Sequence, residues 1–258
     1  MTETQIEVSV IMPALNEEKN IMRAVENVLN SFRELGLSGE IIVVNDGSTD
    51  GTEKMVIDFM QTNKQVRLIH HDTPRGIGAS FWDGVDHARG GAVVLLPGDN
   101  ENSPAEIFRY FKLLEHVDII IPFVFNKEVR SLFRNGLSFV YRFIINSTFA
   151  VYFNYTNGTV LYRTSILKEI PFRSMGFFFQ TDILIRTVKK GYLFAEVPFR
   201  LGVRRQGSSK ALTFPSLINV VKGYLRLVRD FYFAKQIKPS AVFSSDSSTA
   251  ERKRTPVS

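Results

Sequence analysis

Residues 40–50 have the sequence EIIVVNDGSTD, in which a run of apolar, mostly β-branched residues ends in a cluster of turn-forming residues. Such a run is typical of a buried strand, and the cluster is typical of the turn that follows it. Similar apolar runs occur before and after it, at residues 8–12, 66–70, 92–96 and 118–123. Segments with helical spacing separate these runs, at residues 17–32, 52–60, 78–88 and 104–114. Strands without polar alternation, separated by helices, predict an α/β fold with a mostly parallel sheet covered on both faces.

The second half of the chain has a different pattern. It contains a long aromatic and basic stretch, then a loop followed by a strand, a helix, a second strand and an amphipathic helix, at residues 127–153, 155–163, 179–190, 193–197 and 213–233. The last residues are Ser-rich and polar, which favours disorder. We therefore predict one domain over residues 1–238, with parts at 7–125, 126–212 and 213–238, and a disordered tail over residues 239–258.

The composition excludes several classes of protein. The chain of 258 residues has 32 Lys and Arg against 26 Asp and Glu, a formal net charge of +6, and no cysteine. The absence of cysteine excludes a disulfide scaffold and a cysteine nucleophile. No apolar run reaches the roughly 18 residues that a membrane-spanning helix needs. The first residues are acidic and polar, unlike a signal peptide, so we expect a protein that is soluble or lies on a membrane.

Four turns are expected at one edge of the sheet, because the carboxyl ends of parallel strands meet there and ligands bind at that edge. They have the sequences PALNE at residues 13–17, NDGSTD at 45–50, RGIGAS at 75–80 and GDNE at 98–101. Asp99 and Glu101 supply hard oxygen ligands that suit Mg²⁺ or Mn²⁺. Helix capping explains each turn taken alone, since Asp46, Ser48 and Asp50 are good cap residues. The four turns together predict a ligand site.

The same turns carry a family resemblance. The order PALNEE, VVNDGSTDGT, PRGIGAS and LLPGDNE resembles that of family 2 glycosyltransferases, which have the GT-A fold. Later motifs resemble, in order, the polyprenyl-phosphate sugar transferase branch, the relatives of dolichyl-phosphate mannose synthase: Arg130-x3-Arg134-x3-Ser138-x3-Arg142, Thr156-Asn157-Gly158, Phe179-Gln180-Thr181-Asp182, Glu196-Val197-Pro198 and Arg204-x4-Ser209-Lys210. The resemblance covers residues 7–212 and implies a Rossmann-like nucleotide-sugar-binding half at 7–125 and an acceptor half at 126–212.

The resemblance also implies which residues bind the donor. The expected nucleotide-binding residues lie in the four turns: Pro13, Ala14, Asn16, Glu17, Asp46, Gly47, Ser48, Arg75, Gly76, Gly78, Gly98 and Asp99. Asp46 matches the acidic residue that holds the base or the ribose. Pro97-Gly98-Asp99 occupies the position of the family's Asp-x-Asp motif, so Pro97 replaces the first carboxylate. Asp99 and Glu101 are the expected metal ligands.

For the reaction, the resemblance implies that Gln180 and Asp182 lie beside the acceptor and that Arg204 and Lys210 face the diphosphate. The two cations would stabilise the departing nucleoside diphosphate. Asp182 would take the proton from an attacking hydroxyl, whereas a phosphate acceptor is already an anion and needs little help from a base. The acceptor phosphate is expected at a helical stripe with one further residue beyond it: Arg130, Arg134, Ser138, Arg142 and Ser209.

The favoured activity is inverting transfer of a hexose from a nucleotide sugar to a polyprenyl or dolichyl phosphate, with Mg²⁺ or Mn²⁺. GDP-mannose is the favoured donor, ahead of UDP-glucose and UDP-N-acetylglucosamine. One alternative is transfer to a sugar hydroxyl with Asp182 as the base. Another, suggested by Pro97, is a non-catalytic module that binds nucleotide sugars or membranes. A nucleic-acid binder and a sugar nucleotidyltransferase fit less well, because the chain has neither a nucleic-acid motif nor a Gly-rich, Arg-bearing turn after the first strand.

The region before the tail predicts attachment to a membrane surface. From Arg200 to Lys238 the chain has nine Lys and Arg residues against one acidic residue, Asp230, with large apolar residues between them. An anionic leaflet attracts such a segment by about 1 kcal/mol per basic residue. Packing against the protein or against a second subunit explains the pattern equally well. We expect a peripheral protein on the cytoplasmic face of a membrane. The histidines are not expected to form a site, because His70 and His71 point to opposite sides of a strand.

Overall fold

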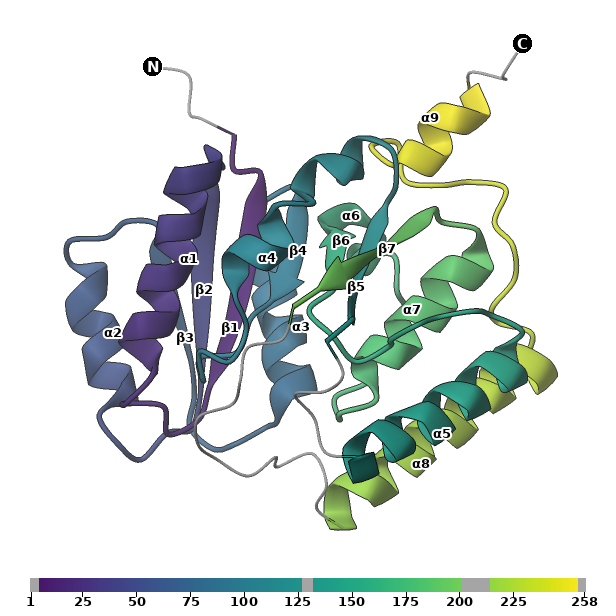
Figure 1. Cartoon of the computed structure of the whole chain (residues 1–258), viewed down its shortest axis with the longest axis horizontal. Helices are drawn as coiled ribbons and strands as arrows, with labels where there is room; N and C mark the ends of the chain where they lie inside the picture. The colour runs from purple at the N-terminus through teal and green to yellow at the C-terminus, as the bar shows by residue number, and fades with distance from the viewer. Residues whose placement is uncertain (1–4, 127–131, 201–213, 255–258) are drawn as a thin grey trace.

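A computed structural model of the chain describes residues 5–126, 132–200 and 214–254 (Figure 1). Its centre is a seven-stranded sheet with the order β3-β2-β1-β4-β6-β5-β7. The strands are β1 (Val8–Ala14), β2 (Gly39–Asp46), β3 (Val66–His71), β4 (Ala92–Leu95), β5 (Ile119–Val124), β6 (Leu161–Arg163) and β7 (Phe194–Phe199). The first four strands are parallel, β6 runs antiparallel to β4 and β5, and β7 is parallel to β5. The predicted α/β fold with a mostly parallel sheet is confirmed.

Each face of the sheet carries its own hydrophobic core, because successive side chains of a strand point to opposite faces. On β1, Ile11 belongs to one core, whereas Val10 and Met12 belong to the other. One face is covered by α1 (Ile21–Leu35), α2 (Thr52–Met60), α4 (Pro104–Phe108) and the 3-10 helix η1 (Phe111–Glu115). The opposite face is covered by α3 (Ile77–His87), α6 (Thr164–Lys168) and α7 (Phe179–Lys190). Burial on both faces explains why the strand sequences lack polar alternation.

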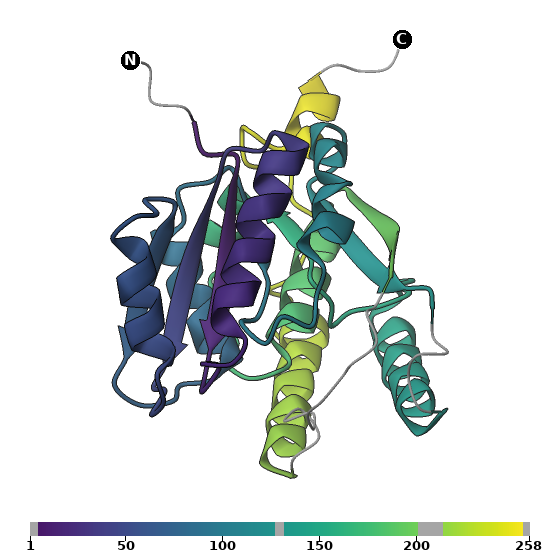
Figure 2. The ribbon, with the colours of Figure 1, turned by 60° about the vertical axis from the view of Figure 1, so that its left-hand side comes forward.

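Two helices, α5 (Leu132–Phe149) and α8 (Phe214–Val228), extend away from the sheet (Figure 2). Near their C-terminal ends they join the core, where Phe149 and Leu227 are fully buried. There the hydroxyls of Thr148 and Tyr224 lie 2.8 Å apart. A π-helical turn, η4 (Arg229–Phe233), follows α8 directly. In the part of the chain that the structure describes, no helix has the length and apolar character that crossing a membrane requires.

The structure differs from the disordered tail predicted at 239–258, because it describes these residues as far as 254 and buries residues 247–250 against the domain. Residues 255–258 lie outside the described residues. The described part of the segment ends in the helix α9 (Ser248–Arg254). The buried carboxylate of Asp118 accepts hydrogen bonds from the backbone amides of Ser248 at 2.7 Å and Thr249 at 3.2 Å. These amides begin α9 and have no partner within the helix, so a carboxylate at this end stabilises it. The Ser-rich composition could not reveal a partner 130 residues away.

Candidate functional site

The four turns expected to form a site do lie together at the carboxyl ends of the first four strands. The first and second turns are joined because the amide of Asn16 donates to Ser48 Oγ at 3.0 Å, and the amide of Thr49 donates to Asn16 Oδ1 at 2.8 Å. The first and fourth turns are joined by the backbone bond from Gly98 N to the carbonyl of Pro13, at 2.9 Å. Asp46 joins the second turn to the third. The sheet edge therefore carries one connected rim.

The contacts of the second turn are mainly structural. The hydroxyl of Thr52 accepts from the amide of Glu17 at 2.8 Å, and Asp50 accepts from the amide of Thr52 at 3.0 Å. Burial raises the pKa of the Asp50 carboxyl, but the hydrogen bonds from Thr52 and Glu18 outweigh that effect and hold this pKa below its ordinary value. Ser48 and Asn16 are likewise engaged with each other. These residues give the rim its shape, and Asn16 is exposed at its surface.

Asp46, expected to hold the base or the ribose, is 5% exposed, and its carboxylate accepts hydrogen bonds from backbone amides of the third turn. Its Oδ1 accepts from the amide of Arg75 at 2.8 Å, and its Oδ2 accepts from the amide of Gly76 at 2.9 Å. The backbone φ of Gly76 is +93°, a conformation that favours glycine. Asp46 therefore fixes the backbone of the third turn.

His71 is the residue at this site that the sequence analysis missed. Its Nδ1 lies 2.8 Å from Asp46 Oδ1, and its Nε2 lies 2.8 Å from Asp83 Oδ2. Asp83 also pairs with Arg75, whose Nη1 is 2.6 Å from Asp83 Oδ2. The pairing of β2 with β3 sets Asp46 opposite His71. This register depends on contacts between strands, and the spacing of histidines along the chain does not reveal it.

The fourth turn carries the expected metal ligands. Asp99 and Glu101 are both half-buried, and Asp99 Oδ1 accepts from the amide of Glu101 at 3.0 Å. Within the described residues, no cluster of three or more His, Asp or Glu side chains is placed to enclose a metal ion. Two carboxylates nevertheless fit Mg²⁺ or Mn²⁺, because such ions are commonly held by one or two carboxylates and complete their shell with substrate phosphates.

Asp182 lies in the first turn of α7, where its side chain is 3% exposed. Its Oδ2 accepts from Arg186 Nε at 2.9 Å, and Arg186 Nη2 donates to Asp230 Oδ2 at 2.7 Å. Burial raises the pKa of Asp182, and the hydrogen bond from Arg186 opposes that rise. Gln180 is also buried. These ion pairs join α7 to η4, so the Asp182 carboxylate is engaged within the protein rather than offered to a hydroxyl.

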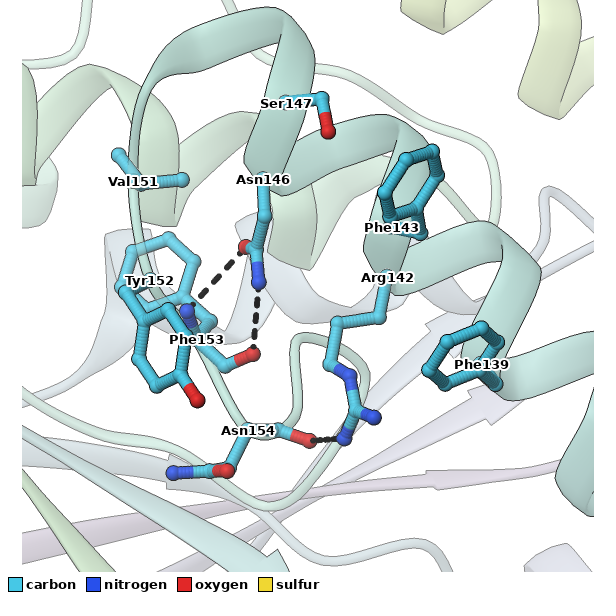
Figure 3. Close-up of a pocket in the computed structure, with 9 residues that line it drawn as sticks. All are labelled: Phe139, Arg142, Phe143, Asn146, Ser147, Val151, Tyr152, Phe153 and Asn154. Atoms are coloured by element: carbon cyan, nitrogen blue, oxygen red, sulfur yellow. Dashed lines mark hydrogen bonds between the residues drawn. The ribbon is translucent and has the colours of Figure 1, made fainter.

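The cationic stripe on α5 is present as far as the structure describes it. Arg134 is exposed, whereas Ser138 and Arg142 are half-buried. Arg142 lines a pocket of about 390 Å³ beside α5, and its Nη1 donates to the carbonyl of Asn154 at 2.9 Å (Figure 3). The other lining residues are mostly aromatic or amide-bearing: Phe139, Phe143, Asn146, Ser147, Val151, Tyr152, Phe153 and Asn154. The pocket thus combines one cation with apolar walls.

A hydrogen-bonded chain holds α5 against α7. The Tyr141 hydroxyl lies 2.8 Å from Thr181 Oγ1, which donates to Asn157 Oδ1 at 3.1 Å. Burial raises the pKa of Tyr141 to about 12, so the phenol stays protonated at neutral pH. These two hydrogen bonds fix the position of Tyr141 on α5, and with it the cationic stripe, relative to the start of α7.

Four of the expected site residues lie outside the described residues: Arg130, Arg204, Ser209 and Lys210. Their assignment to the acceptor phosphate and the diphosphate rests on sequence alone.

Several known proteins are similar to this chain in sequence. An uncharacterised glycosyltransferase of Synechocystis sp. is 34% identical over 116 residues, which are 45% of this chain and 36% of that protein. A dolichyl-phosphate β-glucosyltransferase of Trichomonas vaginalis is 32% identical over 137 residues, covering 51% of this chain and 37% of that protein. The chain thus spans little more than a third of the length of these curated relatives.

Among solved structures, glucosyl-3-phosphoglycerate synthase from Mycobacterium tuberculosis, in complex with Mn²⁺, UDP and glucosyl-3-phosphoglycerate, has a similar fold. The TM-score is 0.64 at 22% identity, over 92% of this chain and 82% of that one. The sequence profile of Glycosyl transferase family 2 matches residues 9–178, which include all four rim turns. The chain belongs to glycosyl transferase family 2.

Proposed function

We propose that this chain transfers a hexose from a nucleotide sugar to the phosphate of a polyprenyl or dolichyl lipid. The observation that carries the proposal is the connected rim, which unites the four family turns at one sheet edge. Ligands bind at this edge in open α/β sheets. The rim supplies exposed polar groups, a cationic side chain in Arg75 and two carboxylates in Asp99 and Glu101.

For the donor, the relatives favour UDP-glucose over the GDP-mannose expected from the sequence. The Trichomonas relative is named for glucose transfer to dolichyl phosphate, and the Mycobacterium structure holds UDP and Mn²⁺. We therefore propose a UDP-hexose, with glucose first.

The proposed reaction is a single displacement with inversion. A phosphate oxygen of the acceptor attacks the anomeric carbon as the bond from that carbon to the nucleoside diphosphate breaks. Asp99 and Glu101 would hold the divalent cation, which when bound neutralises charge on the diphosphate. Arg75, held by Asp83 with half of its side chain exposed, offers a second positive charge at the rim.

The burial of Asp182 and its ion pair with Arg186 favour a phosphate acceptor over a sugar hydroxyl. A hydroxyl must lose a proton as it attacks and needs a base in contact with it. The Asp182 carboxylate is buried against Arg186, so it serves as a positioning group for α7. A phosphate acceptor needs no such base, and the cations of α5 suit it.

The exposed faces of α5 and α8 support contact with a membrane surface. Neither helix contains an acidic residue. Large apolar side chains are at least 40% exposed on both: Leu132, Phe133, Leu137, Phe139, Val140, Phe143 and Ile144 on α5, and Leu217, Ile218, Val221 and Leu225 on α8. Apolar surface combined with basic charge is typical of helices that lie on anionic bilayers. We propose that these helices rest on the membrane that carries the acceptor.

The donor proposal predicts stabilisation by nucleotides in a melting experiment. UDP or UDP-glucose with Mn²⁺, at 100 times its dissociation constant, should add about 2.7 kcal/mol to the free energy of unfolding. Asp99→Asn should remove the Mn²⁺-dependent part of this shift. Asp72→Asn, which changes a fully exposed aspartate near the rim, should leave the shift intact. The absence of a shift with every UDP and GDP ligand would contradict the proposal.

The membrane proposal predicts binding to anionic vesicles. The chain should sediment with phosphatidylserine-containing vesicles, and less so as salt is added, because screening weakens the attraction. The double variant Phe133→Ser, Phe143→Ser should bind at least about tenfold more weakly, since it removes buried apolar area in the interface. Val242→Ser is the matched control, because Val242 is 80% exposed but lies outside both helices. Equal binding of the double variant and wild type would exclude this surface.

A further inference from the structure

The buried ring of His71 has an acidic group on each side. Its side chain is 4% exposed, and its two nitrogens each lie 2.8 Å from a carboxylate oxygen, of Asp46 on one side and of Asp83 on the other. Ionised carboxylates only accept hydrogen bonds, and a neutral imidazole has one donor and one acceptor nitrogen. A ring with an unprotonated nitrogen would therefore set a lone pair against a carboxylate. Two short contacts indicate a donated proton on each side.

The charges of the surrounding groups support the doubly protonated ring. Asp46 comes from the end of β2 and Asp83 from α3, and Arg75 of the third turn lies beside them, with its Nη1 bonded to Asp83 and 3.4 Å from His71 Nε2. A guanidinium only donates hydrogen bonds, so a protonated Nε2 donates to Asp83 at 2.8 Å and accepts nothing from Arg75. Two carboxylates against one guanidinium leave one negative charge. An imidazolium brings the cluster to zero net charge, which favours the buried pair of His71 and Asp46, while Asp83 and Arg75 are partly exposed.

We propose that His71, protonated on both ring nitrogens, is the positioning residue that sets the third turn of the donor site. The inference rests on the proposed function, which makes this turn part of the nucleotide site. Through Asp46, the ring fixes the carboxylate that holds the amides of Arg75 and Gly76. Through Asp83, it fixes the carboxylate that pairs with the Arg75 guanidinium. One buried ring thus aligns the backbone and the side chain of Arg75 at the rim, where the nucleotide sugar is proposed to bind.

Nucleotide affinity measured by calorimetry with UDP and Mn²⁺ tests this role. His71→Gln has a single donor group for two carboxylates on opposite sides, and should raise the dissociation constant by about tenfold or more, the effect of losing one charge-assisted hydrogen bond. His70→Gln is the matched control, because His70 is the adjacent histidine, 42% exposed, and should leave the affinity unchanged. In an Arg75→Ala background, His71→Gln should cause little further loss, because its effect acts largely through Arg75. A residue with only a general structural role would give additive losses.

Nitrogen NMR of histidine-labelled wild-type protein at neutral pH supplies an independent reading. Both ring nitrogens of His71 should give resonances of the protonated type. An unprotonated nitrogen, an unchanged affinity in folded His71→Gln, or additive losses would each overturn the inference. If His71→Gln does not fold, Asp83→Asn replaces it in the cycle, since Asp83 is 26% exposed and its loss frees one side of the ring. Wild-type protein that binds no nucleotide would instead refute the proposed function, and the positioning role with it.

Discussion

At Gly78 the third turn packs closely against the backbone of Met175. A Cβ at this position would lie 2.3 Å from the backbone carbonyl oxygen of Met175. Gly78→Ala should therefore lower the free energy of unfolding by about 1–3 kcal/mol, the usual cost of overpacking. Gly136→Ala is the control in α5, where a Cβ meets nothing within 4 Å, and should stabilise by about 0.5–1 kcal/mol. Urea denaturation measures both, and a neutral Gly78→Ala would show that the two segments can separate.

At the scale of elements, the ion pairs of Arg186 hold α7 against η4. Arg186→Met should cost about 3–5 kcal/mol, because it removes the ion-pair partner of the buried Asp182 carboxylate and leaves Asp230 paired with Arg229 alone. Arg109→Met removes an exposed pair with Glu106 and should change stability by no more than about 1 kcal/mol. Thermal melting measures the loss of stability in each variant. Similar losses in both would show that the buried ion pairs stabilise the fold no more than the exposed pair does.

The Arg186→Met variant should also respond to pH in a defined direction. Burial raises the pKa of Asp182, and the substitution removes the hydrogen bond that opposes this rise. A carboxyl whose pKa is higher in the folded state than in the unfolded state takes up its proton first in the folded state. Lowering the pH from neutral therefore stabilises the folded variant relative to the unfolded one. The cost of the substitution should shrink as the pH falls, and a growing cost would contradict this account.

At the scale of the whole molecule, the C-terminal segment returns to the sheet and is anchored at Asp118. The backbone amides of Leu193, Ser248 and Thr249 all donate to this carboxylate. Asp118→Asn should weaken all three bonds and speed hydrogen exchange of the Ser248 and Thr249 amides by about tenfold or more. Glu251→Gln, an exposed acidic residue on α9, is the control and should leave exchange unchanged. Unchanged exchange in Asp118→Asn would show that other contacts hold α9.

The sequence predicted the strands and helices of the first half well, because burial on both faces leaves continuous apolar runs that local patterns reveal. It did not predict that β6 lies between β4 and β5, since this short strand of three residues gains its place from pairing with distant strands. The same limit applies to α9. Its anchor is a side chain far away in the sequence, and a Ser-rich composition is shared by disordered tails and by such docked segments.

For the site, the sequence identified the four turns. It did not show which of their residues hold the turns together and which are available to contact a ligand. Asp46 and Ser48 were expected to contact the nucleotide, whereas in the structure they hydrogen-bond to neighbouring turns. Local sequence cannot distinguish a carboxylate that binds a ligand from one that binds backbone amides. His71 was overlooked for a related reason, because its partners lie on β2 and α3 rather than nearby in the chain.

The position of α9 beside Asp118 also determines where a label or a support can be attached without covering the rim. Asp118 directly precedes β5, so α9 lies at the edge where β5 begins, the edge at which β1 also begins (Figure 1). The rim lies at the opposite edge, where the strands end. A dye or a solid support coupled to an exposed residue of α9, such as Glu251, would therefore leave the rim open to soluble ligands. Protein immobilised in this way presents the rim outward without any change to the residues of the rim.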